Sequence, residues 1–286
     1  MLCPKLGGYP VSDLRVWRIT ATKNLKLETG TSTLDEVTRQ LPEGYYSTFR
    51  TFAGGKRVLG LSGHLRRLYQ HVSAPEVNET DMRRQLRVLL EPHQPHDARV
   101  RAVMTRQGQV YLAIALLVAL PPEIYENGVR VETTSLQREH PRLKSTSFIG
   151  RSDSERKHIA QEGIFEALLV KEEEILEGMT SNFFYIARRD GSRPHVGTAR
   201  DAILLGITRE TVIAIAQERG LEVKYQPLRL DQLLAIDEAF ITSSSRGIVP
   251  VVRIDNITIG QGTPGSLTQK LMAAYDEYVL QKAEEI

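Results

Sequence analysis

The chain has 286 residues and carries 37 lysines and arginines against 35 aspartates and glutamates, so its formal net charge is only +2. This balance does not indicate a nucleic-acid or anionic-membrane partner, and no uninterrupted apolar run reaches the length of a membrane span. The one cysteine, Cys3, excludes an internal disulfide and fits a reducing compartment, so we expect a soluble, cytoplasmic protein.

Strand and helix patterns mix in the first part of the chain. They predict strands within residues 45–61 and 100–120, and helices over residues 62–72 and 79–92. Gly54-Gly55 marks the first turn, and Ser62 is the expected N-cap of the first helix. We interpret residues 1–119 as a small N-terminal domain.

The pattern breaks at Leu120-Pro121-Pro122, so residues 120–126 are the expected linker. Residues 127–286 are the expected large domain. Its predicted strands lie within 128–136, 165–191, 221–228, 238–245 and 251–260, and its predicted helices cover 152–163, 206–220 and a last segment from Ser266. The fold class predicted from these patterns is α+β in two domains.

Residues 260–265 match the dinucleotide fingerprint G-x-G-x-x-G. That motif needs a parallel strand before it, a helix after it and then a further strand with an acidic residue. Here the preceding strands read as a hairpin and only one helix follows, so we interpret the segment as a loop.

Four segments carry polar residues that suggest chemistry: 142–147, 176–182, 205–209 and 241–250. Each also has a simpler interpretation. A lysine at a strand end is usually a surface charge, and a run of serines between strands is often a plain turn. A threonine at a helix start is commonly a cap, although the free amides there also bind anions.

Together, in this order and spacing, the four segments resemble the fold type IV pyridoxal-phosphate enzymes, the class IV aminotransferase family. That family includes branched-chain and D-amino-acid aminotransferases and 4-amino-4-deoxychorismate lyase. The matching elements are Lys144, Glu177-Gly-Met-Thr-Ser-Asn182, Gly206-Ile-Thr-Arg-Glu210, the serines 243–245 before Pro250, the glycines of 260–265, and His64-Leu-Arg-Arg67-Leu. The resemblance runs from about residue 40 to the end and implies a homodimer with this two-domain α+β fold.

The resemblance implies roles for individual residues. Lys144 would carry pyridoxal 5'-phosphate as a Schiff base and then move the substrate's α-proton. Glu177 would pair with the pyridine nitrogen and keep it protonated. The phosphate would contact Arg67, Ile207, Thr208 and either Ser243 or Ser244. Of the two adjacent arginines, the motif's spacing selects Arg67 and leaves Arg66 as a surface residue.

Candidate substrate residues are Tyr46, Arg50, Ser245 and Arg246. Tyr46 lies where relatives carry an aromatic residue that lines the pocket. Arg50 and Arg246 are candidate carboxylate anchors, because the guanidinium fork suits that group, but each also has a surface interpretation. The segment after Met104 is shorter than the loop that binds carboxylate in D-amino-acid aminotransferases, which argues against a standard D-specific site.

Three functions remain open from the sequence. The first is transfer of an amino group between an amino acid and a 2-oxo acid by a ping-pong mechanism. The second is the lyase reaction, which releases pyruvate and 4-aminobenzoate and uses the same lysine. The third is a binding protein without catalysis, and the presence of Lys144, Glu177 and the full phosphate set argues against it. The amino donor and its handedness are not identified by the motifs.

Overall fold

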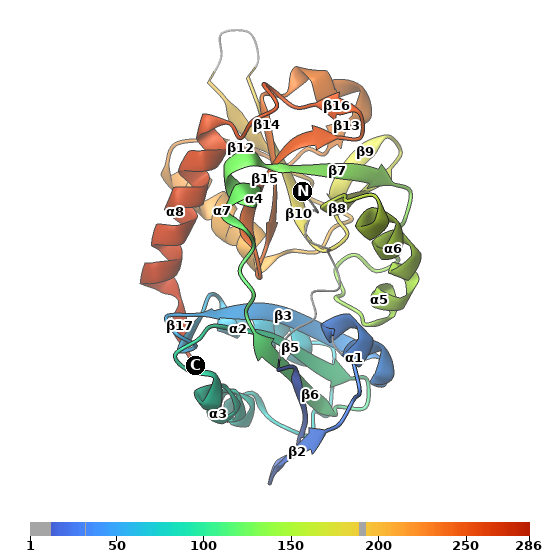
Figure 1. Ribbon diagram of the computed structural model, residues 1–286, viewed down its shortest axis with the longest axis vertical. Coiled ribbons are helices and arrows are strands. Elements are labelled where there is room, and N and C mark those ends of the chain that lie inside the picture. Colours follow the sequence, from blue (N-terminus) through green and yellow to red (C-terminus); the bar gives the residue numbers. More distant parts are fainter. Residues whose placement is uncertain (1–12, 32, 189–192) are drawn as a thin grey trace. The chain divides into compact units, whose positions relative to one another are not determined.

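The computed structural model describes residues 13–31, 33–188 and 193–286. Cys3 and the end of the strand run predicted within 165–191 lie outside the described residues. The chain forms two compact units (Figure 1). The N-terminal unit contains the described residues up to Ala119, Leu143–Asp153 and Val279–Ile286, and the C-terminal unit contains Leu120–Arg142 and Ser154–Tyr278.

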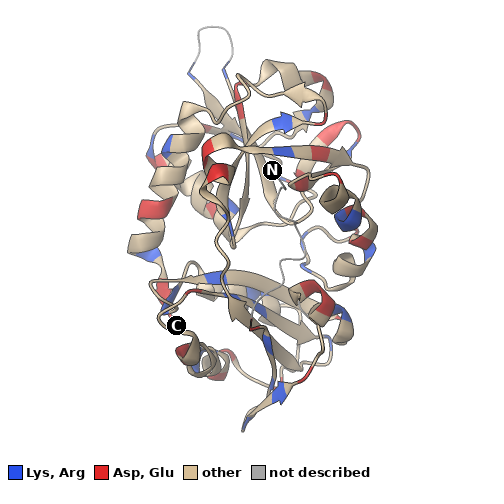
Figure 2. Ribbon diagram, viewed as in Figure 1, with Lys and Arg blue, Asp and Glu red and all other residues tan. Residues whose placement is uncertain are grey.

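Charges of both signs are scattered over each unit (Figure 2), in keeping with the small net charge. Among the described residues, no helix combines the length and the apolar character needed to cross a membrane.

The N-terminal unit is built on a seven-stranded sheet in the order β17-β4-β3-β5-β6-β1-β2. Its strands are β1 (Arg15–Ile19), β2 (Asn24–Leu27), β3 (Gly44–Phe52), β4 (Arg57–Val58), β5 (Ala98–Thr105), β6 (Val110–Leu116) and β17 (Glu284–Glu285). All neighbouring pairs are antiparallel. The helices of this unit are α1 (Leu34–Gln40), α2 (Leu61–Tyr69), α3 (Glu79–Leu90) and α5 (Ser147–Arg151), with a 3-10 turn, η1 (Glu91–His93).

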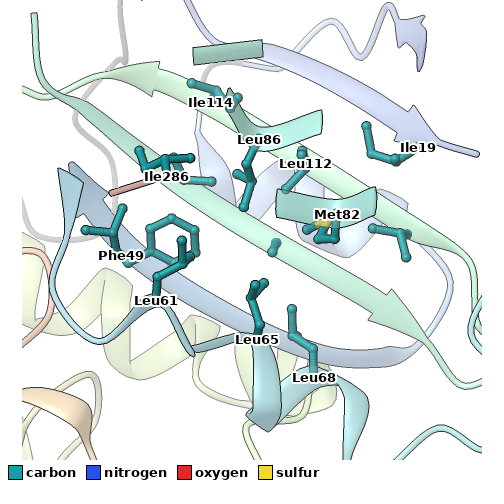
Figure 3. Close-up of a cluster of buried hydrophobic side chains, with 14 of the residues drawn as sticks. Ile19, Phe49, Leu61, Leu65, Leu68, Met82, Leu86, Leu112, Ile114 and Ile286 are labelled. Carbon is teal, nitrogen blue, oxygen red and sulfur yellow. The ribbon is translucent and has the colours of Figure 1, made fainter. Parts of the chain in front are cut away.

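Strand alternation gives this sheet two different faces. One face packs against α2 and α3 in the main core, which includes Phe49, Leu65, Met82, Leu86 and Leu112 (Figure 3). Residues of β3 at an odd spacing from Phe49, such as Tyr46, point to the other face. There Tyr46 packs with Val103, Tyr111 and Ile149 of α5.

The helix predicted over 79–92 is confirmed by α3 and η1, and the first predicted helix is confirmed by α2. The prediction of Ser62 as an N-cap is wrong. Gly60, with a φ of 65°, is the N-cap of α2, and it has no side chain to cap the helix. Ser62 lies in the first turn, where its backbone N–H and its hydroxyl donate to the carboxylate of Glu284.

The C-terminal unit holds a ten-stranded sheet. Its main path is β12-β11-β10-β14-β15-β7-β8-β9-β13, with β16 paired to β15. The strands are β7 (Val129–Thr134), β8 (Glu166–Lys171), β9 (Glu174–Gly178), β10 (Asn182–Ala187), β11 (His195–Gly197), β12 (Glu222–Lys224), β13 (Leu228–Arg229), β14 (Glu238–Ser243), β15 (Gly247–Ile254) and β16 (Ile257–Thr258). Because β9 also pairs with β10 through Glu177 and Asn182, the strands from β10 to β9 close into a ring.

The remaining helices are α4 (Pro122–Asn127), α6 (Asp153–Gln161), α7 (Ile207–Glu218), α8 (Ser266–Lys282) and the 3-10 helix η2 (Leu230–Ala235). Most of helix α4 lies within residues 120–126, which were predicted as a linker. Ile124 and Tyr125 of this helix pack against the core of the C-terminal unit. Leu143–Asp153, assigned to the large domain from the sequence, groups with the N-terminal unit.

Residues 260–265 form the predicted loop. The strands before it, β15 and β16, are antiparallel. The start of the following helix is occupied by a carboxylate of the chain itself, because the backbone N–H groups of Leu267 and Thr268 donate to Glu238 at 3.1 and 2.7 Å. An added Cβ on Gly265 would lie 2.0 Å from that carboxylate carbon. The segment therefore packs closely against the Glu238 side chain and does not form a nucleotide-binding loop.

Candidate active site

The backbone around Lys144 is fixed by the first residues of β3. Tyr46 donates its N–H to the Lys144 carbonyl at 2.9 Å, and Thr146 donates its N–H to the Gly44 carbonyl at 2.9 Å. The Gly44 N–H donates in turn to the Thr146 hydroxyl at 3.0 Å. Gly44 also lies against β5, where an added Cβ would meet the Met104 carbonyl at 2.1 Å. A glycine here lets β3 bind β5 and the Lys144 segment at once.

The Lys144 amine lies beside an aromatic ring. Its Nζ is 5.0 Å from the centroid of Tyr46, and the guanidinium carbon of Arg101 is 4.9 Å from the same centroid. Both distances are within the range of cation–π attraction. Tyr46 is itself buried. Arg101 was not singled out from the sequence, where it reads as one of several arginines on a strand.

Helix α2 presents His64 and Arg67 on one face, because residues three apart on a helix are neighbours. His64 is fully buried and its Nδ1 lies 2.8 Å from the Ser47 hydroxyl. Burial lowers the pKa of His64 well below its ordinary value, and the positive charges of Arg67 and Lys144 lower it further. The positive charges of Arg67 and Lys144 thus both disfavour protonation of the buried His64 imidazole, which remains neutral.

The adjacent arginines differ in exposure, since Arg66 is exposed and Arg67 is partly buried. We expect Arg67→Ala to weaken cofactor binding by about 2 kcal/mol, as loss of one charge-assisted contact does. Arg66→Ala should change affinity little and is the matched control. Equilibrium dialysis of the cofactor against both variants measures the difference. Greater loss in Arg66→Ala would show that the register of the motif is off by one residue.

Glu177, at the end of β9 in the C-terminal unit, is a buried carboxylate with several donors. Its Oε1 accepts from Arg138 Nε at 3.0 Å, and its Oε2 accepts from the Leu204 N–H at 3.0 Å and from Asn182 Nδ2 at 3.2 Å. These donors favour the ionised form of the carboxyl group. Arg138 was not predicted as a site residue. It lies in an irregular segment after β7, and only its contact with Glu177, 39 positions away, distinguishes it from other arginines.

The start of helix α7 lies close to the Glu177 carboxylate, in the same unit. Its N-cap is Gly206, and within the described part of the chain no side chain caps the helix. The Asn182 amide oxygen would lie 2.2 Å from a Cβ added to Gly206, so the glycine allows the helix start to approach Asn182. The first amides, those of Ile207 and Thr208, carry the positive end of the helix dipole and suit an anion.

The serine turn adds hydroxyl groups to this helix start. The Thr208 hydroxyl lies 3.5 Å from that of Ser244. Ser243 accepts a hydrogen bond from Arg246 Nε at 3.0 Å, and Ser245 is a partly buried residue of the same turn. Thr208, Ser244 and Ser243 all carry hydroxyl groups suited to a phosphate, because the Ser243 oxygen that accepts from Arg246 keeps its own O–H to donate.

Arg246 is not a free surface cation. Its Nη2 donates to Glu166 Oε2 at 3.0 Å and to the Thr180 hydroxyl at 2.7 Å, and its guanidinium lies over the Phe165 ring. Glu166 is itself buried, so the two charges neutralise one another. Nη1 of Arg246 is buried without a hydrogen-bond acceptor among the described residues. That donor is the part of Arg246 still suited to a carboxylate.

Arg50 lies on the same side of β3 as Tyr46, four residues further along the strand. Its guanidinium stacks on Phe52 at 4.6 Å, and its Nη2 is 3.7 Å from Asp97 Oδ2. Asp97 also accepts from the Gly55 N–H at 3.0 Å, at the turn after β3. These contacts fix Arg50 at the end of the hairpin, with about a quarter of its side chain exposed (28%).

The predicted residues thus fall into two sets, one in each unit. The N-terminal unit holds Lys144, Tyr46, Arg50 and Arg67, and the C-terminal unit holds Glu177, Ile207, Thr208, Ser243, Ser244, Ser245 and Arg246. The residue types fit pyridoxal phosphate: an amine, a buried carboxylate suited to a pyridinium, and an uncapped helix start with hydroxyl groups beside it.

Comparison with known proteins defines the class. The model of the family described as amino-transferase class IV matches residues 44–254. D-alanine aminotransferase of Bacillus licheniformis is 31% identical over 262 residues, which cover 84% of this chain and 89% of the relative. A branched-chain-amino-acid aminotransferase of Pseudomonas aeruginosa is 32% identical over 170 residues, covering 57% of this chain and 53% of the relative.

The fold has solved counterparts. A branched-chain aminotransferase of Thermoproteus uzoniensis, solved with norvaline, superposes with a TM-score of 0.73 at 24% identity and covers 94% of this chain and 95% of that one. The PLP-bound form of a hypothetical aminotransferase from Mycobacterium tuberculosis gives a TM-score of 0.74 at 18% identity, covering 93% of this chain and 99% of that one.

The chain belongs to the class IV aminotransferase family. It is a pyridoxal-phosphate-dependent transaminase of that class, and the predictions of family, fold type IV architecture and cofactor are confirmed.

Proposed function

We propose that this enzyme moves an amino group between an amino acid and a 2-oxo acid by a ping-pong mechanism, with Lys144 as the residue that bonds the cofactor. The observation that carries the proposal is the buried Glu177 carboxyl group, which accepts hydrogen bonds from Arg138, Asn182 and the Leu204 amide. Bound pyridoxal phosphate supplies the electron sink for removal of the substrate's α-proton, and an anionic partner at its ring nitrogen strengthens that sink.

Each predicted residue has a proposed task. Lys144 holds the cofactor and afterwards moves the α-proton, from a backbone fixed by Gly44, Tyr46 and Thr146. The phosphate is bound by Arg67, by the amides of Ile207 and Thr208, and by the hydroxyl of Ser244, with Ser243 as the alternative.

The substrate carboxylate is assigned to arginine donors. Nη1 of Arg246 is the favoured anchor, because it is buried without an acceptor among the described residues while the rest of the group is fixed by Glu166. Arg50, Tyr46 and Ser245 are proposed to line the substrate pocket. We also propose that the enzyme is a cytoplasmic homodimer, as the family pattern implies.

A half-reaction screen tests the reaction type. The loaded enzyme is mixed with single L- and D-amino acids, without a 2-oxo acid, while the cofactor absorbance is followed. We expect at least one amino acid to convert the cofactor to its aminated form and to yield the matching oxo acid. The relatives described above are named aminotransferases, which favours this outcome. Release of pyruvate and 4-aminobenzoate from aminodeoxychorismate, with no conversion by any amino acid, would contradict the proposal.

A further inference from the structure

The side of the N-terminal sheet that carries Tyr46 also carries a buried ion pair. Arg101 of β5 donates Nη1 to Asp35 Oδ1 of helix α1 at 2.5 Å, and the two side chains are only 6% and 11% exposed. The same nitrogen donates to the Thr38 hydroxyl at 3.1 Å, and Nε donates to the Thr48 hydroxyl at 3.0 Å. Partners on α1 and β3 therefore fix both the position and the plane of the guanidinium.

This fixed guanidinium shares one aromatic ring with the Lys144 amine. The two cationic groups lie 4.9 and 5.0 Å from the Tyr46 centroid, so their separation is at most the sum of these distances. The ring is held by Ile149 of α5 and by Val103 and Tyr111. Arg101 and Tyr46 are buried and Lys144 is partly buried, so at this range the charge of Arg101 acts on the Lys144 amine unless another charge offsets it.

We propose that Asp35 and Arg101 form a positioning pair for Lys144, in which the carboxylate orients and neutralises the guanidinium that shares the Tyr46 ring with the lysine. Neither residue needs to touch the reacting atoms. Breaking a buried ion pair leaves one uncompensated charge, whereas replacing both partners by neutral groups does not. The inference rests on the proposed role of Lys144 as the residue that bonds the cofactor.

Three other titratable groups of the N-terminal unit lie near the Lys144 amine or the buried imidazole beside it. Tyr46 of β3 supplies the ring beside the Lys144 amine. Arg67 of α2, like Lys144, lowers the pKa of His64 by its positive charge. His64 of α2 is neutral, because burial and both cations lower its pKa. A change at Asp35 or Arg101 is therefore expected to appear directly in the titration of the nitrogen of Lys144.

The test is a pH titration of the visible absorbance of the cofactor-loaded enzyme, in wild type and four variants. Asp35→Asn leaves Arg101 uncompensated, which disfavours a protonated nitrogen and should lower the midpoint by about one pH unit. Arg101→Gln removes the positive charge beside the Tyr46 ring and keeps the negative charge of Asp35, so it should raise the midpoint. The double variant should return close to the wild-type value. Glu43→Gln, which breaks the exposed pair with Arg106 near the start of β3, is the control and should not move it.

Opposite signs for the two single variants are the outcome that a merely structural role does not give. Shifts in the same direction, or shifts no larger than that of Glu43→Gln, would overturn the inference. If Asp35→Asn does not fold, Arg101→Gln decides alone: a raised midpoint supports the pair, and an unchanged or lowered one contradicts it. Failure of the proposed function is a separate result, since wild type would then carry no cofactor on Lys144.

Discussion

Replacing Lys144 with alanine is expected to abolish the covalent link to the cofactor and to reduce turnover by roughly 10³-fold or more, because one amine both holds the cofactor and moves the α-proton. The protein should still fold, since the Lys144 segment is fixed through its backbone by Gly44, Tyr46 and Thr146. Steady-state turnover and the cofactor spectrum are the measurements, with thermal unfolding as the check on folding.

Lys56 offers a matched control, because it is an exposed lysine of the same unit. Lys56→Ala should keep the cofactor spectrum and the turnover of wild type. Turnover within tenfold of wild type in Lys144→Ala would remove Lys144 from the catalytic role.

Glu177→Gln is expected to keep the cofactor bonded but to slow α-proton removal by about 100-fold, because a neutral amide no longer favours a protonated ring nitrogen and a charge-assisted contact is worth up to about 3 kcal/mol. It should also lower the free energy of unfolding by about 3–5 kcal/mol, since it leaves the buried Arg138 without its counter-charge. Stopped-flow absorbance with an α-deuterated substrate separates the proton step from folding.

Glu172→Gln, at an exposed carboxylate before β9, is the control for loss of an acidic side chain. It should leave both the proton step and the stability unchanged. An unaltered rate of α-proton removal in Glu177→Gln would assign the electron-sink role to a different residue.

Segments with strong periodicity were predictable from the sequence. The helices α3 and α7 have long apolar faces that need no knowledge of their partners, and α8 begins at the predicted Ser266. The segment that contains β1, β2 and α1 was not predicted, because its strands have four or five residues and its helix has seven. Such short elements are stabilised by tertiary packing more than by local propensity.

The residues of the site that form motifs were visible in the sequence, and the residues that support them were not. Asp35 illustrates the reason. In the sequence it is an ordinary acid in the first turn of a short helix, beside the capping box of Thr33 and Glu36. Only the fold buries it against Arg101, 66 positions away in the chain. Arg138 and Glu166 are similar, because their partners Glu177 and Arg246 are also distant in sequence.

The assignment of Lys144 is tested most directly by borohydride reduction of the loaded wild-type enzyme, followed by tryptic digestion and mass spectrometry. Reduction makes the bond to the cofactor permanent and blocks cleavage after the modified lysine. We predict the label in the peptide from Leu143 to Arg151, with the added mass on Lys144. A label on any other lysine, or none on this peptide, would contradict the account.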